Sequence, residues 1–334
     1  MVRITLAAAH PPAAHPPAAH PPDVADVGGR TSLAHFADCG FDQRIKVILP
    51  ARPEGDIPLG DPESWYRDLR SLPDGRRPAA RTYTVRSVRN PGRPDAEIDI
   101  DVVLHGTDGP ASAWAASAVG AVAADAVAMG AVAVDAAAAA HPTDATRVTL
   151  VGPDARFDAD HGGRAFVTTE RRDLLIAGDE TALPAIAAIA ERLDRDSTGT
   201  VLIEVPTGYD AIPLSAPPGM EVTFLPRDGA RGGARHGELL VGAASAWRPT
   251  QASRPAHLAG HESRRAAIDL GRIQRWDELA WDVPDPGETG GIRAWIAGEA
   301  GSVRAIRRHL VGACGLRRDE VAFMGYWRLG RSEN

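Results

Sequence analysis

Cysteine, lysine and long apolar runs are scarce in this chain of 334 residues. Its two cysteines, Cys39 and Cys314, lie far apart and form no C-x-x-C pair. Two thiols cannot hold an iron–sulfur cluster, which needs about four thiolates, and they do not make a disulfide framework. No apolar run reaches the roughly 20 residues of a membrane span, because Asp125 and Asp135 interrupt the alanine-rich stretch. The sequence therefore predicts neither an iron–sulfur protein nor a membrane-spanning helix.

Positive charge is also in deficit, with a formal net charge of −7 and an isoelectric point near 5.9. A general nucleic-acid binder would carry a net basic domain, so nucleic acid is not an expected partner. The start, "MVRITLAAAHPP", has one arginine and too short an apolar run for an export signal, which favours a cytoplasmic location. The length suffices for two domains, and we expect a monomer.

Two segments of biased composition interrupt the chain. Residues 7–22 repeat "AAHPP", and the three histidines are held apart by stiff Pro-Pro pairs, which favours a solvated loop over a metal site. Residues 117–145 are rich in alanine, which favours helix, until His141-Pro142 ends the run. We expect a surface insertion of irregular helix there.

Hydrophobic periodicity changes character near the middle of the chain. Before it, short β-type runs such as "RIKVILP" and "EIDIDVVLHG" are separated by turn residues, which is typical of a small antiparallel barrel. After Gly163, strand patterns alternate with helix patterns, as in "DLLIAGDETALPAIAAIAERL", which predicts a parallel sheet covered by helices. The sequence predicts a β-barrel followed by an α/β domain, with the boundary between residues 153 and 170.

The segment "RTYTVR" (residues 81–86) combines a cation, a ring and a hydroxyl on a strand period. Arg81 suits a pyrophosphate, because the guanidinium fork matches phosphate oxygens. Tyr83 could pack against a planar ring, and Thr84 could bind a flavin edge. Taken alone, the segment would also fit an exposed edge strand with a surface arginine.

Three further segments follow in order: "DIDVVLHG" (99–106), "GPASAWA" (109–115) and "GDETALPAI" (178–186). Together with the first, they resemble the siderophore-interacting proteins, flavin-dependent ferric-siderophore reductases of the ferredoxin-reductase-like superfamily. The resemblance runs from Phe41 to Gly330 and includes "GYWRLG" at residues 325–330. It implies an N-terminal FAD-binding barrel over residues 1–155. A C-terminal NAD(P)-binding domain over residues 165–334 is implied as well, with its last segment closing on the flavin.

The resemblance also implies flavin contacts. His105 alone would more often be structural, and Trp114 could serve packing alone. Gly109 and its neighbours open a helix, whose free N–H groups can meet phosphate. The implied flavin-binding residues are Arg81, Tyr83, Thr84, His105, Gly109, Ala111, Ser112, Trp114 and Trp327.

The turn at residues 178–182 is where the family takes the nicotinamide nucleotide, although it is not a G-x-G-x-x-G fingerprint. The implied contacts are Gly178, Asp179, Thr181 and Ala182, whereas Glu180 is expected to have a structural role at the helix start. Arg227 and Arg231, at and past the end of the strand "EVTFLPR", are placed for the 2′-phosphate of NADPH or are surface arginines. The choice between NADPH and NADH stays open.

Substrate selection is expected to rest on positive charge, since many ferric siderophores are anionic. Lys46, the sole lysine of the chain, and Arg328 are the candidate substrate-binding residues. In the expected reaction, hydride passes from NAD(P)H to FAD, and electrons then pass to Fe(III) and free the iron. No covalent catalyst and no metal ligand are expected.

Two alternatives to this function remain, and the start of the chain raises a further expectation. The alternatives are a general flavin or quinone reductase on the same fold, and a flavin- or siderophore-binding protein without turnover. Relatives extend upstream of "MVRITL", so we also expect either an earlier start or a barrel that lacks a strand.

Overall fold

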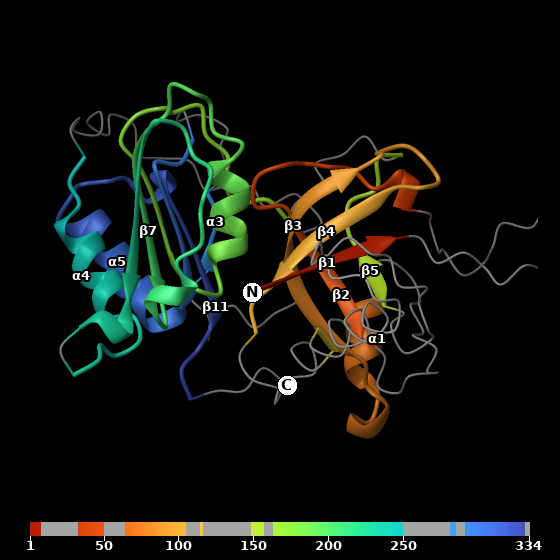
Figure 1. The fold of residues 1–334 in the computed structure, drawn as a ribbon. Helices are drawn as coiled ribbons and strands as arrows, with labels where there is room; N and C mark the ends of the chain where they lie inside the picture. Colours follow the sequence, from red (N-terminus) through yellow and green to blue (C-terminus); the bar gives the residue numbers. More distant parts are fainter. Residues whose placement is uncertain are drawn as a thin grey trace, which may run out of the picture. The chain divides into compact units, whose positions relative to one another are not determined.

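A computed structural model describes residues 1–7, 33–49, 64–104, 114–115, 148–156, 163–230, 232–249, 281–284 and 291–330. The chain divides into two compact units (Figure 1). The first comprises Met1–Asp38 and Arg44–His161, and the second comprises Cys39–Gln43 and Gly162–Asn334. Within the described ranges, no helix is long and apolar enough to cross a bilayer.

The first unit is built on an antiparallel sheet with the strand order β1-β4-β3-β2-β5. Its strands are β1 (Val2–Ala7), β2 (Arg44–Leu49), β3 (Ala79–Arg89), β4 (Glu97–Val102) and β5 (Thr149–Val151). Alternation along each strand sends side chains to opposite faces. One face carries a core that includes Ile45, Val47 and Ile98. On the other, Ile48 packs with Trp65 and Leu69 of helix α1 (Trp65–Ser71).

The second unit contains a six-stranded sheet in the order β8-β7-β6-β10-β11-β9. Strands β6 (Leu174–Asp179), β7 (Thr198–Val205), β8 (Gly219–Pro226), β10 (Ala294–Glu299) and β11 (Val321–Trp327) are parallel, and β9 (Trp281–Asp282) is antiparallel to β11. The expected fold class, an antiparallel sheet followed by a parallel α/β sheet, is confirmed.

Helices cover both faces of the second sheet. Leu174 and Ile176 of β6 contact α3 (Leu183–Ala190), whereas Leu175 and Ala177 belong to the core under α4 (Glu238–Ala246) and α5 (Ala300–Gly312). Figure 1 shows α3 on one side of the sheet and α4 and α5 on the other. A strand buried on both faces reads as a continuous apolar run, which explains "LLIAG". Short 3-10 turns complete the described elements: η1 (Leu33–His35), η2 (Asp74–Arg76), η4 (Gly208–Asp210), η5 (Arg227–Gly229) and η6 (Arg318–Glu320).

A five-residue segment from early in the chain completes the second unit. Asp42 is fully buried and accepts hydrogen bonds from the N–H groups of Ala165 and Phe166, at 3.0 and 2.8 Å. It also accepts one from Nε1 of the buried Trp295, at 3.0 Å. A buried carboxylate is tolerated when several donors satisfy it. Residues 39–43 therefore belong to the core of the α/β unit.

Candidate functional site at the carboxyl edge of the parallel sheet

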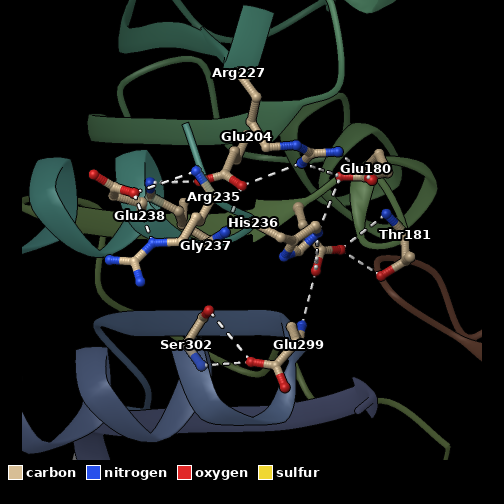
Figure 2. A network of polar contacts seen from close by, with 12 residues as sticks. Glu180, Thr181, Glu204, Arg227, Arg235, His236, Gly237, Glu238, Glu299 and Ser302 are labelled. Carbon is tan, nitrogen blue, oxygen red and sulfur yellow. Dashed lines mark hydrogen bonds and ion pairs between the residues drawn. The ribbon is translucent and has the colours of Figure 1, made fainter. Parts of the chain in front are cut away.

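Polar side chains gather where the parallel strands of the second unit end (Figure 2). Asp179 ends β6, Glu204 is the second-last residue of β7, and Glu299 ends β10. Arg227 follows β8, and Trp327 ends β11. In open α/β sheets, ligands bind outside the carboxyl ends of the strands. This edge is therefore the candidate site of the α/β unit.

Asp179 organises the centre of the edge from a fully buried position. Its Oδ1 accepts the N–H of Thr181 at 2.9 Å, and its Oδ2 accepts the N–H of Glu299 at 2.8 Å and Nε1 of Trp327 at 3.0 Å. Burial raises the pKa of Asp179 above its ordinary value, although the side-chain hydrogen bonds from Thr181 and Trp327 oppose the shift. The carboxyl group thus ties together β6, β10 and β11.

Gly298 leaves the space that Asp179 fills. Its φ of +137° lies in a region that favours glycine, and a Cβ there would stand 2.5 Å from Oδ2 of Asp179. Gly178 is similarly confined, because a Cβ would meet the Cβ of Ala182 at 2.6 Å. The glycines in "IAGEA" and "IAGDE" are thus required by close packing at this edge.

Arg227 joins the ends of β6, β7 and β8. Its Nη2 and Nη1 donate to Oε1 and Oε2 of Glu180 at 2.8 and 2.9 Å, and Nη1 also donates to Oε1 of Glu204 at 3.1 Å. The Arg227 side chain is 15% exposed and that of Glu180 is 12% exposed. Burial alone would raise the pKa of Glu180, but His236 and Arg227 hold it down at about 2.

Glu204 also caps helix α4. It is fully buried, and its carboxylate accepts the N–H of Gly237 at 2.6 Å and that of Leu240 at 2.9 Å. The first N–H groups of a helix lack intrahelical partners, so this carboxylate supplies them. Gly237 begins the helix with a φ of +79°. Glu299 caps α5 in the same way by accepting the N–H of Ser302 at 2.9 Å.

His236 completes the network beside Trp327. The two rings are edge to face, with centroids 4.7 Å apart and an interplanar angle of 84°. Its Nε2 lies 3.5 Å from Oε2 of Glu180 and 3.7 Å from Oδ2 of Asp179. Burial would lower the pKa of His236, but the two carboxyl groups raise it above its ordinary value. Trp327 is thereby held between Asp179 and His236.

In the first unit, the structure brings only some of the predicted flavin residues together. Arg81 and Tyr83 lie opposite Val47 and Ile45 on the core face of β3, where Tyr83 packs against that core. Burial raises the pKa of Tyr83 to about 12, and the nearby Arg81 opposes the shift. Thr84 alternates to the other face and is buried.

Lys46 lies on the same face as Thr84. It is opposite Thr82 in the pairing of β2 with β3, and its Nζ donates to Oγ1 of Thr82 at 2.6 Å. Its ammonium also stands 6.0 Å from the ring centroid of Tyr66. The candidate substrate lysine is therefore fixed over strand β3 and helix α1.

The other predicted site residues divide in two. Trp114 packs against the core of the first unit, and Arg328 follows β11 with its side chain half-buried. His105, Gly109, Ala111 and Ser112 lie outside the described residues, as do most of the repeat at 7–22 and the whole insertion at 117–145. In the second unit, Gly178, Asp179, Thr181, Ala182, Arg227 and Trp327 gather at one edge, although Asp179 and Ala182 are fully buried.

Three residues of this edge escaped the sequence analysis: Glu204, His236 and Glu299. Glu204 stands in a strand pattern, and its role depends on Arg227 and α4, which follow much later in the chain. His236 precedes the glycine that starts α4, a local signal for a helix start but not for a site. Only the topology of the sheet brings them together.

Both units match known families. The model of the siderophore-interacting FAD-binding domain matches residues 27–131, and that of the siderophore-interacting protein matches residues 171–330. The chain belongs to the siderophore-interacting protein family.

Several known proteins are similar to this chain. An uncharacterized protein of Mycobacterium tuberculosis is 34% identical over 191 residues, covering 56% of this chain and 54% of that protein. The chain thus spans about half the length of that relative. The ferric vibriobactin reductase ViuB of Vibrio cholerae is 26% identical over 293 residues, covering 86% of this chain and 78% of that protein. The siderophore-interacting protein SipS from Aeromonas hydrophila shares the fold, with a TM-score of 0.53 and 22% identity over 99% of this chain and 93% of that one.

Proposed function

We propose that this protein is a cytoplasmic, flavin-dependent reductase of ferric siderophores that draws its electrons from NAD(P)H. The observation that carries the proposal is the pair of family matches, one to a FAD-binding domain and one to a siderophore-interacting domain. The similarity to the ferric vibriobactin reductase supports the same reaction class. Flavin supplies the chemistry that converts a two-electron donor into single-electron transfers to iron.

The described residues of β3 fit a flavin nucleotide. Arg81 and Tyr83 share one face of the strand, two positions apart, which offers a guanidinium for phosphate beside an aromatic ring. In the proposal, Arg81 binds the pyrophosphate, Tyr83 packs on the ring system and Thr84 contacts the flavin edge. His105, Gly109, Ala111, Ser112, Trp114 and Trp327 complete the proposed flavin contacts.

The carboxyl edge of the second sheet fits a nicotinamide nucleotide through its topology and the start of α3. One backbone donor of this edge is already used, because the N–H of Thr181 donates a hydrogen bond to Asp179. We therefore propose that the small residues Gly178 and Ala182 allow the backbone of the turn to come close to the nucleotide. Asp179 and Thr181 are proposed to fix the conformation of the turn. Asp179 also fixes the indole of Trp327, which orients the segment proposed to close on the flavin.

Substrate binding is proposed to depend on Lys46 and Arg328. An anionic ferric siderophore needs local positive charge on a protein whose net charge is −7. The hydroxyl of Thr82 and the ring of Tyr66 hold the ammonium of Lys46 in place. The side chain therefore loses little freedom of motion when it binds a siderophore. Iron here is the substrate's cargo, and reduction to Fe(II) weakens its bonds to hard oxygen donors.

A two-stage assay tests this function. The purified protein should show flavin absorption that bleaches with NADH or NADPH and returns when a ferric siderophore is added. Lys46→Gln should slow the second stage several-fold at low salt, less at high salt, and leave the first stage unchanged. Absence of flavin would contradict the proposal. Faster return with quinones than with ferric siderophores would favour a general reductase, and flavin that never bleaches would favour a binding protein.

A further inference from the structure

Recognition of a 2′-phosphate needs a cation that is available to it. NADPH differs from NADH by this phosphate, which proteins of this topology bind with an arginine near the end of a neighbouring strand. An arginine fork binds a phosphate in the same two-pronged way as it binds a carboxylate. Whether the arginine at that position is already paired with carboxylates therefore affects the preference for NADPH or NADH.

Arg227 occupies this place just past β8, and its fork is already filled. Both terminal nitrogens bind the carboxylate of Glu180 at 2.8 and 2.9 Å, and one also binds Glu204 at 3.1 Å. Only 15% of the side chain is exposed, and Glu204 is fully buried. Moving Arg227 to a phosphate would leave Glu204 without its cation in the interior, which is strongly unfavourable.

The charge around Arg227 also opposes a phosphate. Two carboxylates, Glu180 and Glu204, face one guanidinium (Figure 2). The carboxyl group of Asp179 lies 3.7 Å from Nε2 of His236 within the same network. Even with His236 protonated, the cluster has no excess of positive charge. A phosphate of about two negative charges would gain little there.

Arg231 lies outside the described residues, and another arginine of this region, Arg235, is on the surface. Arg235, in the segment before α4, has a side chain that is 93% exposed and lies 3.4 Å from Glu238. An exposed pair of this kind contributes little and is screened by salt. Glu238 therefore serves as a surface comparison for Glu180, because it makes the same type of ion pair with an arginine but in an exposed position.

We infer that Arg227 is a structural clasp between the ends of β6, β7 and β8 and not a ligand of the 2′-phosphate, so that this position favours a nicotinamide dinucleotide without that phosphate, NADH over NADPH. The inference rests on the proposed function and refines it. It assigns Arg227 a role different from the 2′-phosphate contact considered from the sequence. It makes Glu180 the residue that determines specificity, since Glu180 neutralises Arg227.

Calorimetry with two fragments tests this without turnover. 5′-AMP and 2′,5′-ADP differ only in the 2′-phosphate, and the native protein should bind 5′-AMP at least as tightly. Glu180→Gln should remove one of the two carboxylates and free Nη2 of Arg227, while Glu204 keeps Nη1 in place. It should shift the affinity ratio about tenfold toward 2′,5′-ADP, a change of about 1.4 kcal/mol. Glu238→Gln should leave the ratio unchanged. If Glu180→Gln does not fold, Glu180→Ala removes the same carboxylate.

The outcomes separate this inference from the proposed function. Tighter binding of 2′,5′-ADP by the native protein, an unchanged ratio in a folded Glu180→Gln variant, or no binding of either fragment would overturn the inference. Flavin bleaching at lower concentrations of NADH than of NADPH supports it. A protein that binds 5′-AMP preferentially but whose flavin never bleaches would refute the reductase and leave the specificity assignment standing.

Discussion

Replacing Arg81 by alanine is expected to release FAD from the purified protein. A charge-assisted phosphate contact is worth roughly 1.5–3 kcal/mol, which corresponds to a tenfold or greater loss of affinity. Flavin absorbance per chain after gel filtration measures the effect. Arg93→Ala is the control, because that side chain is 70% exposed in the turn after β3. Equal flavin content in both variants would contradict the assignment of Arg81.

Glu180 makes a prediction about pH at the same scale. Its pKa lies at about 2 in the folded protein, against an ordinary value of 4.5. A depressed carboxylate stabilises the fold above its unfolded pKa, and this contribution disappears as pH falls toward the folded value. The difference in unfolding free energy between the native protein and Glu180→Gln should therefore be fully present near pH 5, and part of it is lost at higher pH as His236, whose pKa Glu180 helps to raise, loses its proton. The difference should shrink by roughly 2 kcal/mol between pH 5 and 2.5, after allowance for partial solvent screening.

Denaturant unfolding across this pH range provides the measurement. Glu180 also contributes to the raised pKa values of Asp179 and His236, so the comparison with Glu180→Gln reports on these three coupled groups together. At neutral pH, Glu238→Gln should change stability by no more than about 0.5 kcal/mol, since its carboxylate is exposed. A difference that stays the same down to pH 2.5 would contradict the ion-pair account of Glu180.

At the scale of elements, β10 depends on a glycine at its carboxyl end. Gly298→Ala places a methyl group against the carboxylate of Asp179 and retains a backbone angle that favours glycine. We expect a loss of roughly 2–3 kcal/mol in unfolding free energy. Gly242→Ala is the matched control, because nothing lies within 4 Å of its added Cβ in α4. That change should stabilise by up to about 1 kcal/mol, and equal melting temperatures in the two variants would refute the argument.

Elements with strong local patterns were predictable from sequence, and partnerships between distant elements were not. The runs "RIKVIL" and "LLIAGD" predicted strands because alternation and continuous apolar character are local signals. Family resemblance assigned Gly178 and Thr181 to the nicotinamide turn and Trp327 to the flavin, whereas the structure brings Thr181 and Trp327 together on Asp179. The pairing of Arg227 with Glu180 and Glu204 required side-chain geometry, because three strand ends must be placed before the arginine's partners are known.

At the scale of the whole molecule, Asp42 connects segments that lie far apart in the sequence. Asp42→Ala should destabilise the α/β unit by about 3 kcal/mol or more, because three buried donors lose their acceptor. Trp295→Phe removes one donor and keeps most of the packing. The double variant should therefore cost less than the sum of the two single changes, as measured by chemical unfolding. Strict additivity would mean that the hydrogen bond between Asp42 and Trp295 contributes nothing.

The position of Asp42 has a consequence for how the chain folds. Residues 39–43 are synthesised early, but the groups that donate hydrogen bonds to Asp42 lie at residues 165, 166 and 295. Synthesis at about 5–20 residues per second separates Asp42 from Trp295 by tens of seconds at the slower rate. During that interval the carboxylate of Asp42, which is buried in the folded protein, is exposed to water, and the α/β unit lacks part of its core. A fragment that starts at residue 162 would lack Asp42 permanently. No single division of the gene therefore yields both units complete.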